Sequence, residues 1–134
     1  MKIAAFDNGA RRQVVALFGA GLIGGAVLNE LRKRRRCDLL DLPFSWTHAQ
    51  AQPDELQTIM AHILKAAENS GERSSIDIVW SAGKGGFSAP QAVFDAETKT
   101  LARVLEAFRR GACESPQRFR YHLFSSAGGL FEGR

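Results

Sequence analysis

Short apolar runs and helical patterns alternate along most of the chain. The apolar runs are predicted to be strands at Gln13–Phe18, Cys37–Leu42, Ser75–Trp80 and Arg120–Phe124. Between them, apolar residues recur every three or four positions, as they do on the buried face of a helix. This alternation predicts an α/β fold in which right-handed crossovers connect a doubly wound parallel sheet, with helices on both of its faces.

The predicted helices have recognisable start and stop signals. The first begins in a run of glycines and ends in a run of basic residues. The second opens at Pro53 and ends at residues 69–71, which read Asn-Ser-Gly. The third begins near Pro90, and Gly111 is predicted to cap its C-terminus.

Two segments fit this alternation less well. Residues 1–12 precede the first predicted strand; their Asn8-Gly9 pair suits a hairpin turn, and a frayed N-terminal arm is the alternative. Residues 43–52 leave no room for a crossover helix and a further strand, so our hypothesis there is a short strand at residues 44–46. We therefore expect an N-terminal arm followed by one domain, residues 13–134.

The letters GAGLIG, which begin at Gly19, form a G-x-G-x-x-G motif between a predicted strand and a predicted helix. That context is the one a dinucleotide-binding fingerprint requires. Gly19 would allow the tight turn, Gly21 the close approach of a pyrophosphate, and Gly24 the packing of helix on strand. Free N–H groups at Leu22 and Ile23 would hold the phosphates. The motif predicts a Rossmann-type domain; a glycine turn that binds nothing is the alternative.

An acidic side chain is expected about 20 positions after the first glycine, where it binds the adenosine ribose. Asp41 lies at about that spacing from Gly19, at the end of the second predicted strand, whereas Asp38 comes too early. No arginine directly follows Asp41. The sequence therefore favours NAD over NADP as the cofactor.

Three later segments resemble the extended short-chain dehydrogenases/reductases, the NAD-dependent epimerase/dehydratase family. SIDIVWSAGKGG resembles the family's fourth strand and the loop that passes over the cofactor with an Ala-Gly pair, here Ala82-Gly83. TLARVLEAFRRGA resembles its next helix, and YHLFSSAGGLFEG resembles its fifth strand and active-site Ser-Ser segment. With the glycine motif, the resemblance covers most of residues 13–133.

The resemblance implies an oxidoreductase that moves a hydride between a nicotinamide and a hydroxyl or carbonyl substrate, such as a nucleotide sugar. Ser126 matches the active-site Ser/Thr that hydrogen-bonds the substrate, and Ser125 is the alternative in a shifted register. A polar strand end without a catalytic role is the structural alternative for both serines.

Two departures from the family bear on activity. Phe18 stands where the family usually has its first glycine. The family's Tyr-x-x-x-Lys pair is absent, because Tyr121 is the only tyrosine of the sequence and Ser125 stands where the lysine would be. Since the sequence stops at Arg134, we expect the cofactor-binding part of such an enzyme without its substrate-binding part. A non-catalytic dinucleotide-binding or sensing module is the alternative.

Charge adds a third functional class. The net charge is +4, and most of the excess lies in the run Arg32–Arg36. A solvated helix end, where cations complement the negative end of the helix dipole, is the favoured interpretation. A basic nucleic-acid-binding surface is the alternative, although no aromatic residues interleave with the run to stack on bases. Nucleic acid is therefore not the expected partner.

The remaining composition excludes several classes. No apolar run approaches the roughly 18 residues that span a bilayer, and the first residues lack the apolar core of a signal peptide. The two cysteines, Cys37 and Cys113, are too few for a disulfide scaffold. The three histidines have no metal-ligand spacing, and no acid is evident to orient His122. We expect a cytoplasmic protein without a metal, with a homodimer as one possible assembly.

Overall fold

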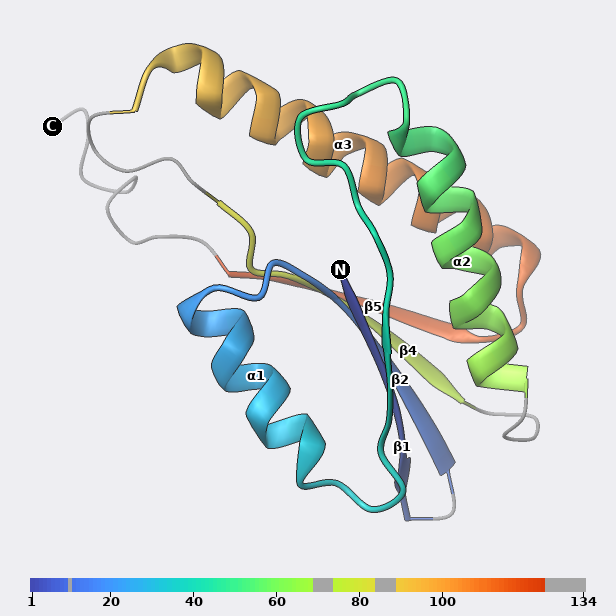
Figure 1. The fold of residues 1–134 in the computed structure, drawn as a ribbon. Coiled ribbons are helices and arrows are strands. Elements are labelled where there is room, and N and C mark those ends of the chain that lie inside the picture. The colour runs from blue at the N-terminus through green and yellow to red at the C-terminus, as the bar shows by residue number, and fades with distance from the viewer. Residues whose placement is uncertain (10, 69–73, 84–88, 125–134) are drawn as a thin grey trace, which may run out of the picture.

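In the computed structural model, a five-stranded sheet forms the middle layer, and helices lie on both of its faces (Figure 1). The structure describes residues 1–9, 11–68, 74–83 and 89–124. The strands are β1 (Lys2–Asn8), β2 (Arg11–Phe18), β3 (Asp38–Asp41), β4 (Ser75–Trp80) and β5 (Arg118–Leu123), and the helices are α1 (Leu22–Arg32), α2 (Gln52–Glu68) and α3 (Gln91–Glu114).

The sheet is mixed, with the strand order β3-β1-β2-β4-β5. β2, β4 and β5 are mutually parallel, whereas β1 is antiparallel to both β2 and β3. The prediction of an α/β fold is confirmed, but the prediction of a purely parallel sheet is wrong. The reason is the short connection at Gly9, whose φ of +66° suits a tight turn, because strands joined by such a turn can only pair antiparallel.

β1 is an interior strand of the sheet, not a free arm. Its side chains from Ile3 to Phe6 are buried and alternate between the two faces. The residues that point to one face pack with α2 and α3, and those that point to the other pack with α1. The Asn8-Gly9 pair therefore marks a hairpin, and β3 pairs with the outer edge of β1 instead of with β2.

Phe18, the last residue of β2, is the centre of an aromatic cluster on the α2 and α3 face. Its ring lies 5.2 Å from that of Phe44, 5.9 Å from Trp80 and 5.9 Å from Phe108, measured between centroids. Phe18 is fully buried. This cluster joins the end of the sheet to α3 and to the segment that leads into α2, so it holds together the elements at the carboxyl end of β2.

Two local predictions are wrong. Residues 44–46 form no strand; they belong to the segment that crosses the sheet between β3 and α2, where Phe44 is buried in the core (Figure 1). Gly111 does not end α3, which continues to Glu114. A Cβ at Gly111 would come 2.6 Å from Met60 Cε, so the glycine permits close packing of α3 on α2.

None of the helices in the described part of the chain is both long and apolar enough to cross a membrane.

We predict that Phe18→Ala lowers the free energy of unfolding by about 3–5 kcal/mol, because it empties a fully enclosed site in the aromatic cluster. Urea unfolding followed by circular dichroism measures the change. Phe94→Ala is the matched control, since Phe94 on α3 is 38% exposed, and it should cost much less. Equal losses in the two variants would contradict a core centred on Phe18.

Candidate functional site

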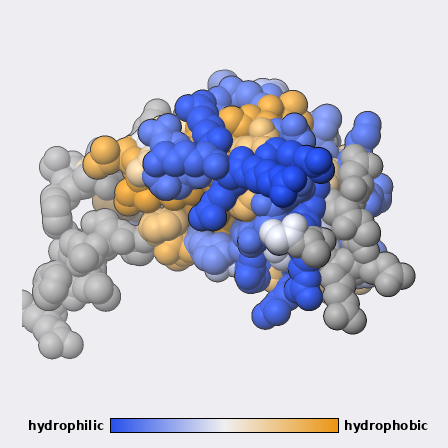
Figure 2. All heavy atoms as spheres, turned by 90° about the horizontal axis from the view of Figure 1, so that it is seen from below, coloured by the Kyte–Doolittle hydropathy of each residue, from blue (hydrophilic) through white to orange (hydrophobic). Residues whose placement is uncertain are grey.

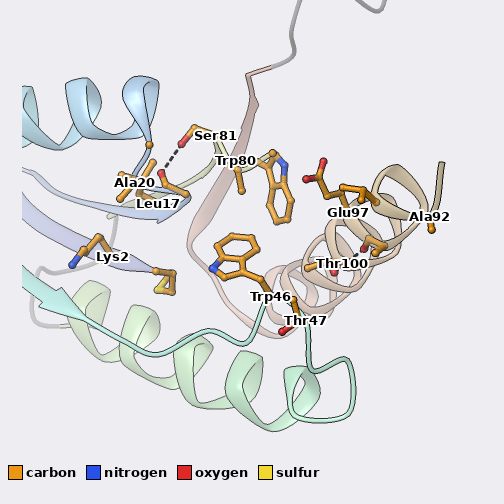
Figure 3. A pocket seen from close by; sticks show the side chains of 17 residues that line it. Lys2, Leu17, Ala20, Trp46, Thr47, Trp80, Ser81, Ala92, Glu97 and Thr100 are labelled. Carbon is orange, nitrogen blue, oxygen red and sulfur yellow. Dashed lines mark hydrogen bonds between the residues drawn. The ribbon is translucent and has the colours of Figure 1, made fainter. Parts of the chain in front are cut away.

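A cavity of about 680 Å³ opens at the carboxyl ends of β2 and β4, beside the start of α1. In α/β sheets, ligands bind in the crevice outside the carboxyl ends of the strands. Small residues from the loops after β2 and β4 form one wall, and the first half of α3 forms the opposite wall (Figure 3). Trp46 and Trp80 lie between these walls.

The loop after β2 turns at Gly19, whose φ of +94° is accessible to glycine and strained for other residues. A Cβ at Gly19 would come 2.6 Å from the backbone nitrogen of Ala82. The two loops are also tied together by Ser81, whose hydroxyl donates to the carbonyl oxygen of Gly19 at 2.7 Å. Gly19 therefore lets the loops after β2 and β4 approach each other closely.

The other two glycines of the motif differ sharply in their surroundings. A Cβ at Gly24 would come 1.9 Å from the carbonyl oxygen of Gly19 and 2.6 Å from Ser81 Oγ, so this glycine lets α1 pack under the loop. A Cβ at Gly21 would have no atom within 4 Å. Gly21 lines the cavity, and its missing side chain leaves backbone open to a ligand.

Gly21 is also the N-cap of α1, where it provides no side chain to accept hydrogen bonds from the helix. The first N–H groups of a helix lack partners within the helix, and the helix dipole makes this end positive. No acidic side chain lies in the first turn of α1 to compensate. The start of α1 therefore presents backbone N–H donors that have no partner among the described residues, together with a positive field, at the edge of the cavity.

The two tryptophans give the cavity one aromatic surface. Their rings meet edge to face, with centroids 5.7 Å apart and planes at 69°. Trp80 is buried at the end of β4, whereas Trp46 comes from the segment between β3 and α2 and is 36% exposed. A flat, apolar ring system could pack against this wall.

The charged side chains in the cavity's described lining are those of Lys2 and Glu97. Lys2 begins β1, and its ammonium group pairs with the carboxylate of Asp41, directly opposite it on β3. The hydrogen bond from Lys2 holds the pKa of Asp41 below its ordinary value. Thr100 completes the polar part of the lining on α3.

The structure brings together only part of the predicted cofactor site. Gly19, Gly21, Ala82 and Gly83 line the cavity, whereas Gly24 lies beneath the loop. The side chain of Leu22 is 94% exposed and that of Ile23 is 48% exposed, and neither lines the cavity. Ser125 and Ser126 lie outside the described residues.

Asp41 does not line the cavity. Because β1 separates β3 from β2, Asp41 stands roughly 10 Å from β2, twice the spacing of adjacent strands. Lys2 of β1 is nearer to the glycine loop than Asp41 is, because it pairs directly with Leu17 of β2. Sequence reasoning missed Lys2 and Trp46, since it predicts an arm at residues 1–12 and only a short strand within residues 43–52. The Asn8-Gly9 pair is the one signal that points to β1.

Within the described residues, no group of three or more His, Cys, Asp and Glu side chains is arranged to hold a metal ion. No protein-family model, curated protein or solved structure matches the chain.

We predict that Gly24→Ala destabilises the protein by about 3 kcal/mol or more, since the new Cβ would overlap a backbone oxygen that cannot move without breaking the loop. Gly25→Ala is the matched control in the same helix, because a Cβ there lies 3.8 Å from the nearest atom. The control should be neutral or slightly stabilising. Urea unfolding measures both, and a tolerated Gly24→Ala would show that the loop and α1 are not in close contact.

Proposed function

We propose that the chain binds a nicotinamide dinucleotide at the glycine loop and serves as the cofactor-binding part of an oxidoreductase. The observation that carries the proposal is the glycine motif beside a cavity at the carboxyl ends of β2 and β4: Gly19 and Gly21 line the cavity, and Gly24 lets α1 pack under the loop. Gly21 is the most informative of the three, because its open side faces space that a ligand could fill.

The residues present fit a dinucleotide. The uncapped start of α1 would receive the pyrophosphate, whose charge matches the positive end of the helix dipole. The wall of Trp46 and Trp80 offers a surface for a planar ring, and the cavity volume lies within the range of small-molecule sites. When bound, the nicotinamide supplies or accepts a hydride.

The reaction is proposed from the resemblance to the epimerase/dehydratase family, with a hydroxyl or carbonyl substrate such as a nucleotide sugar. A proton must move together with the hydride, and an unperturbed tyrosine, with a pKa near 10, needs a nearby cation to act as acid or base at neutral pH. Tyr121 does not meet this need, since burial raises its pKa despite the opposing influence of Arg109. The described residues therefore support cofactor binding more strongly than catalysis.

Replacing Gly21 with valine tests the proposal most directly. We predict that Gly21→Val abolishes binding of NAD and NADP, because the new side chain would fill the space needed by the pyrophosphate. The fold should be unaffected, since a Cβ at Gly21 meets no atom within 4 Å. Isothermal titration measures binding, and circular dichroism verifies folding. Gly25→Ala again serves as the control that should bind like the wild type.

Failure of the wild-type protein to bind either dinucleotide would refute the proposal. Retained affinity in a folded Gly21→Val variant would move the phosphates away from this loop.

The Lys2–Asp41 pair provides a separate test of cofactor choice. We expect the wild type to prefer NAD, because Asp41 pairs with Lys2, the ammonium group at the cavity that would otherwise attract the extra phosphate of NADP. Asp41→Asn should leave the Lys2 ammonium without its charge partner, so that it attracts the extra phosphate of NADP and raises the affinity for NADP relative to NAD. Lys2→Met should change the NAD-to-NADP affinity ratio in the opposite direction. An unchanged ratio in both variants would place the ribose elsewhere.

A further inference from the structure

A second hollow, of about 410 Å³, lies at the opposite end of the sheet from the glycine loop. Four arginines line it: Arg11, Arg12, Arg118 and Arg120. They come from the starts of β2 and β5, and the described lining includes no aspartate or glutamate. We refer to this site as the arginine hollow.

We propose that the arginine hollow is a second binding site, separate from the glycine loop, and that it takes phosphate groups, either from a nucleic-acid backbone or from a small phosphorylated compound.

Two of the four arginines have no charge partner within the described part of the chain. Arg12 pairs with Asp7 and Asp38, and Arg120 pairs with Asp77. The exposed side chains of Arg11 and Arg118 make no hydrogen bond or ion pair with any described residue. Two guanidinium groups without a described charge partner match the charge of a phosphate dianion or of two successive phosphodiesters. Each guanidinium group can donate two parallel hydrogen bonds to two oxygens of one phosphate.

A buried carboxylate holds part of the lining in place. Asp77 lies in the middle of β4, and its side chain is only 5% exposed. One of its oxygens accepts from Gln13 Nε2 and from Arg120, each at 2.7 Å. Gln13 in turn accepts a hydrogen bond from Asn8 Nδ2 at 3.0 Å. The side chains of Asn8, Gln13 and Arg120 are therefore fixed before a ligand arrives.

The ionisation of Asp77 keeps this arrangement intact at neutral pH. Burial raises its pKa, but the hydrogen bonds from Arg120, His122 and Gln13 together outweigh burial, so the net pKa lies below the ordinary value. Its second oxygen meets His122 Nε2 at 2.7 Å. Arg120 therefore keeps its ion pair with Asp77 at neutral pH, while the exposed part of its side chain lines the hollow.

Arg12 carries an independent sign of an unmet interaction. Its Nε is buried and has no hydrogen-bond partner in the described structure, although buried donors are nearly always paired. However, strand residues alternate between faces, and the Arg12 side chain lies on the face of Val14 and Ala16, with its charged end toward Asp7 and Asp38. The class of ligand is therefore argued from Arg11 and Arg118, which line the hollow and have no described partner.

The positive surface continues beyond the hollow. The carbonyl oxygen of Arg35 accepts a hydrogen bond from the Asp7 backbone at 3.0 Å, and Arg36 lies 3.6 Å from the Asp7 carboxylate. The basic run after α1 therefore lies beside the hairpin that provides Arg11 and Arg12. Figure 2, which views the molecule from below, shows hydrophilic side chains gathered across this end. Such an extended basic surface suits a ligand with several phosphates.

The test uses the full chain and two probes, a fluorescein-labelled RNA hairpin in an anisotropy titration and inorganic pyrophosphate in calorimetry. We expect the wild type to bind at least one probe. The double variant Arg11→Ala/Arg118→Ala should lose at least tenfold in affinity. For RNA, the slope of log K against log salt should flatten by roughly 0.9 for each phosphate that the variant no longer neutralises. Binding of RNA alone identifies a nucleic-acid backbone, and binding of pyrophosphate identifies a small ligand.

The matched control is Arg109→Ala/Arg110→Ala, which removes the same charge from α3, where both arginines pair with Glu106 outside the hollow. It should bind nearly as the wild type does. Arg118→Lys, which keeps the charge but loses the planar fork, should show an intermediate decrease in affinity. Circular dichroism of each variant verifies the fold, which should be unchanged because these side chains are exposed.

Three results would overturn the proposal: no binding of either probe, equal decreases in affinity in the two double variants, or pyrophosphate binding that Gly21→Val removes and Arg11→Ala/Arg118→Ala leaves intact. The last result would assign the phosphate to the glycine loop. Conversely, loss of NAD binding in Gly21→Val together with unchanged RNA binding would show that the two sites are separate.

Discussion

The position of β1 between β2 and β3 is the constraint on which the rest of the structure depends. A strand joined to β2 by a tight turn must lie antiparallel beside it, and it thereby takes the edge of β2 that β3 would otherwise occupy. β3 then pairs with the far edge of β1. This single insertion makes the sheet mixed, moves Asp41 one strand farther from the glycine loop, and places Lys2 at the cavity.

At the carboxyl ends of β2 and β4, steric demands organise the site more than charge does. The loops meet so closely that neither Gly19 nor Gly24 could carry a side chain, and Ser81 ties the loops together through the carbonyl of Gly19. At Gly21, by contrast, no atom of the protein lies close enough to exclude a side chain. A glycine that the fold does not require fits a site where something outside the chain approaches the backbone.

Most elements could be predicted from local patterns, because the spacing of apolar residues shows whether a segment is a helix or a strand, and residues such as glycine and proline mark its ends. The predicted strand Ser75–Trp80 coincides with β4, and the start of α1 follows directly from the glycine motif. Pairing could not be predicted in the same way, since the choice of neighbours in a sheet is non-local. The Asn8-Gly9 pair indicates a hairpin, but nothing in the sequence near β3 shows that it pairs with β1.

The non-local pairing of strands also explains why the sequence did not reveal the partners of several charged side chains. Asp77 and His122 lie 45 positions apart, and only the parallel register of β4 and β5 brings their side chains to 2.7 Å. A search of the sequence near His122 finds no acid to orient it, although the structure provides one. The arginine hollow was hidden for the same reason, because the sheet and not the chain brings Arg11 and Arg118 to one hollow, from strands on either side of β4.

Asp77 gives the strongest reason to regard the polar end of the sheet as more than a solvated surface. Burying a carboxylate is costly, and replacing a buried ionic group with apolar residues is often neutral or stabilising. An apolar side chain at this position would extend the packing made by Val79 on the same face of β4. Instead, the chain buries a carboxylate and surrounds it with donors from β2 and β5. Stability alone does not call for that choice; its structural effect is to hold Arg120 and Gln13 in place at the hollow where we propose that an anion binds.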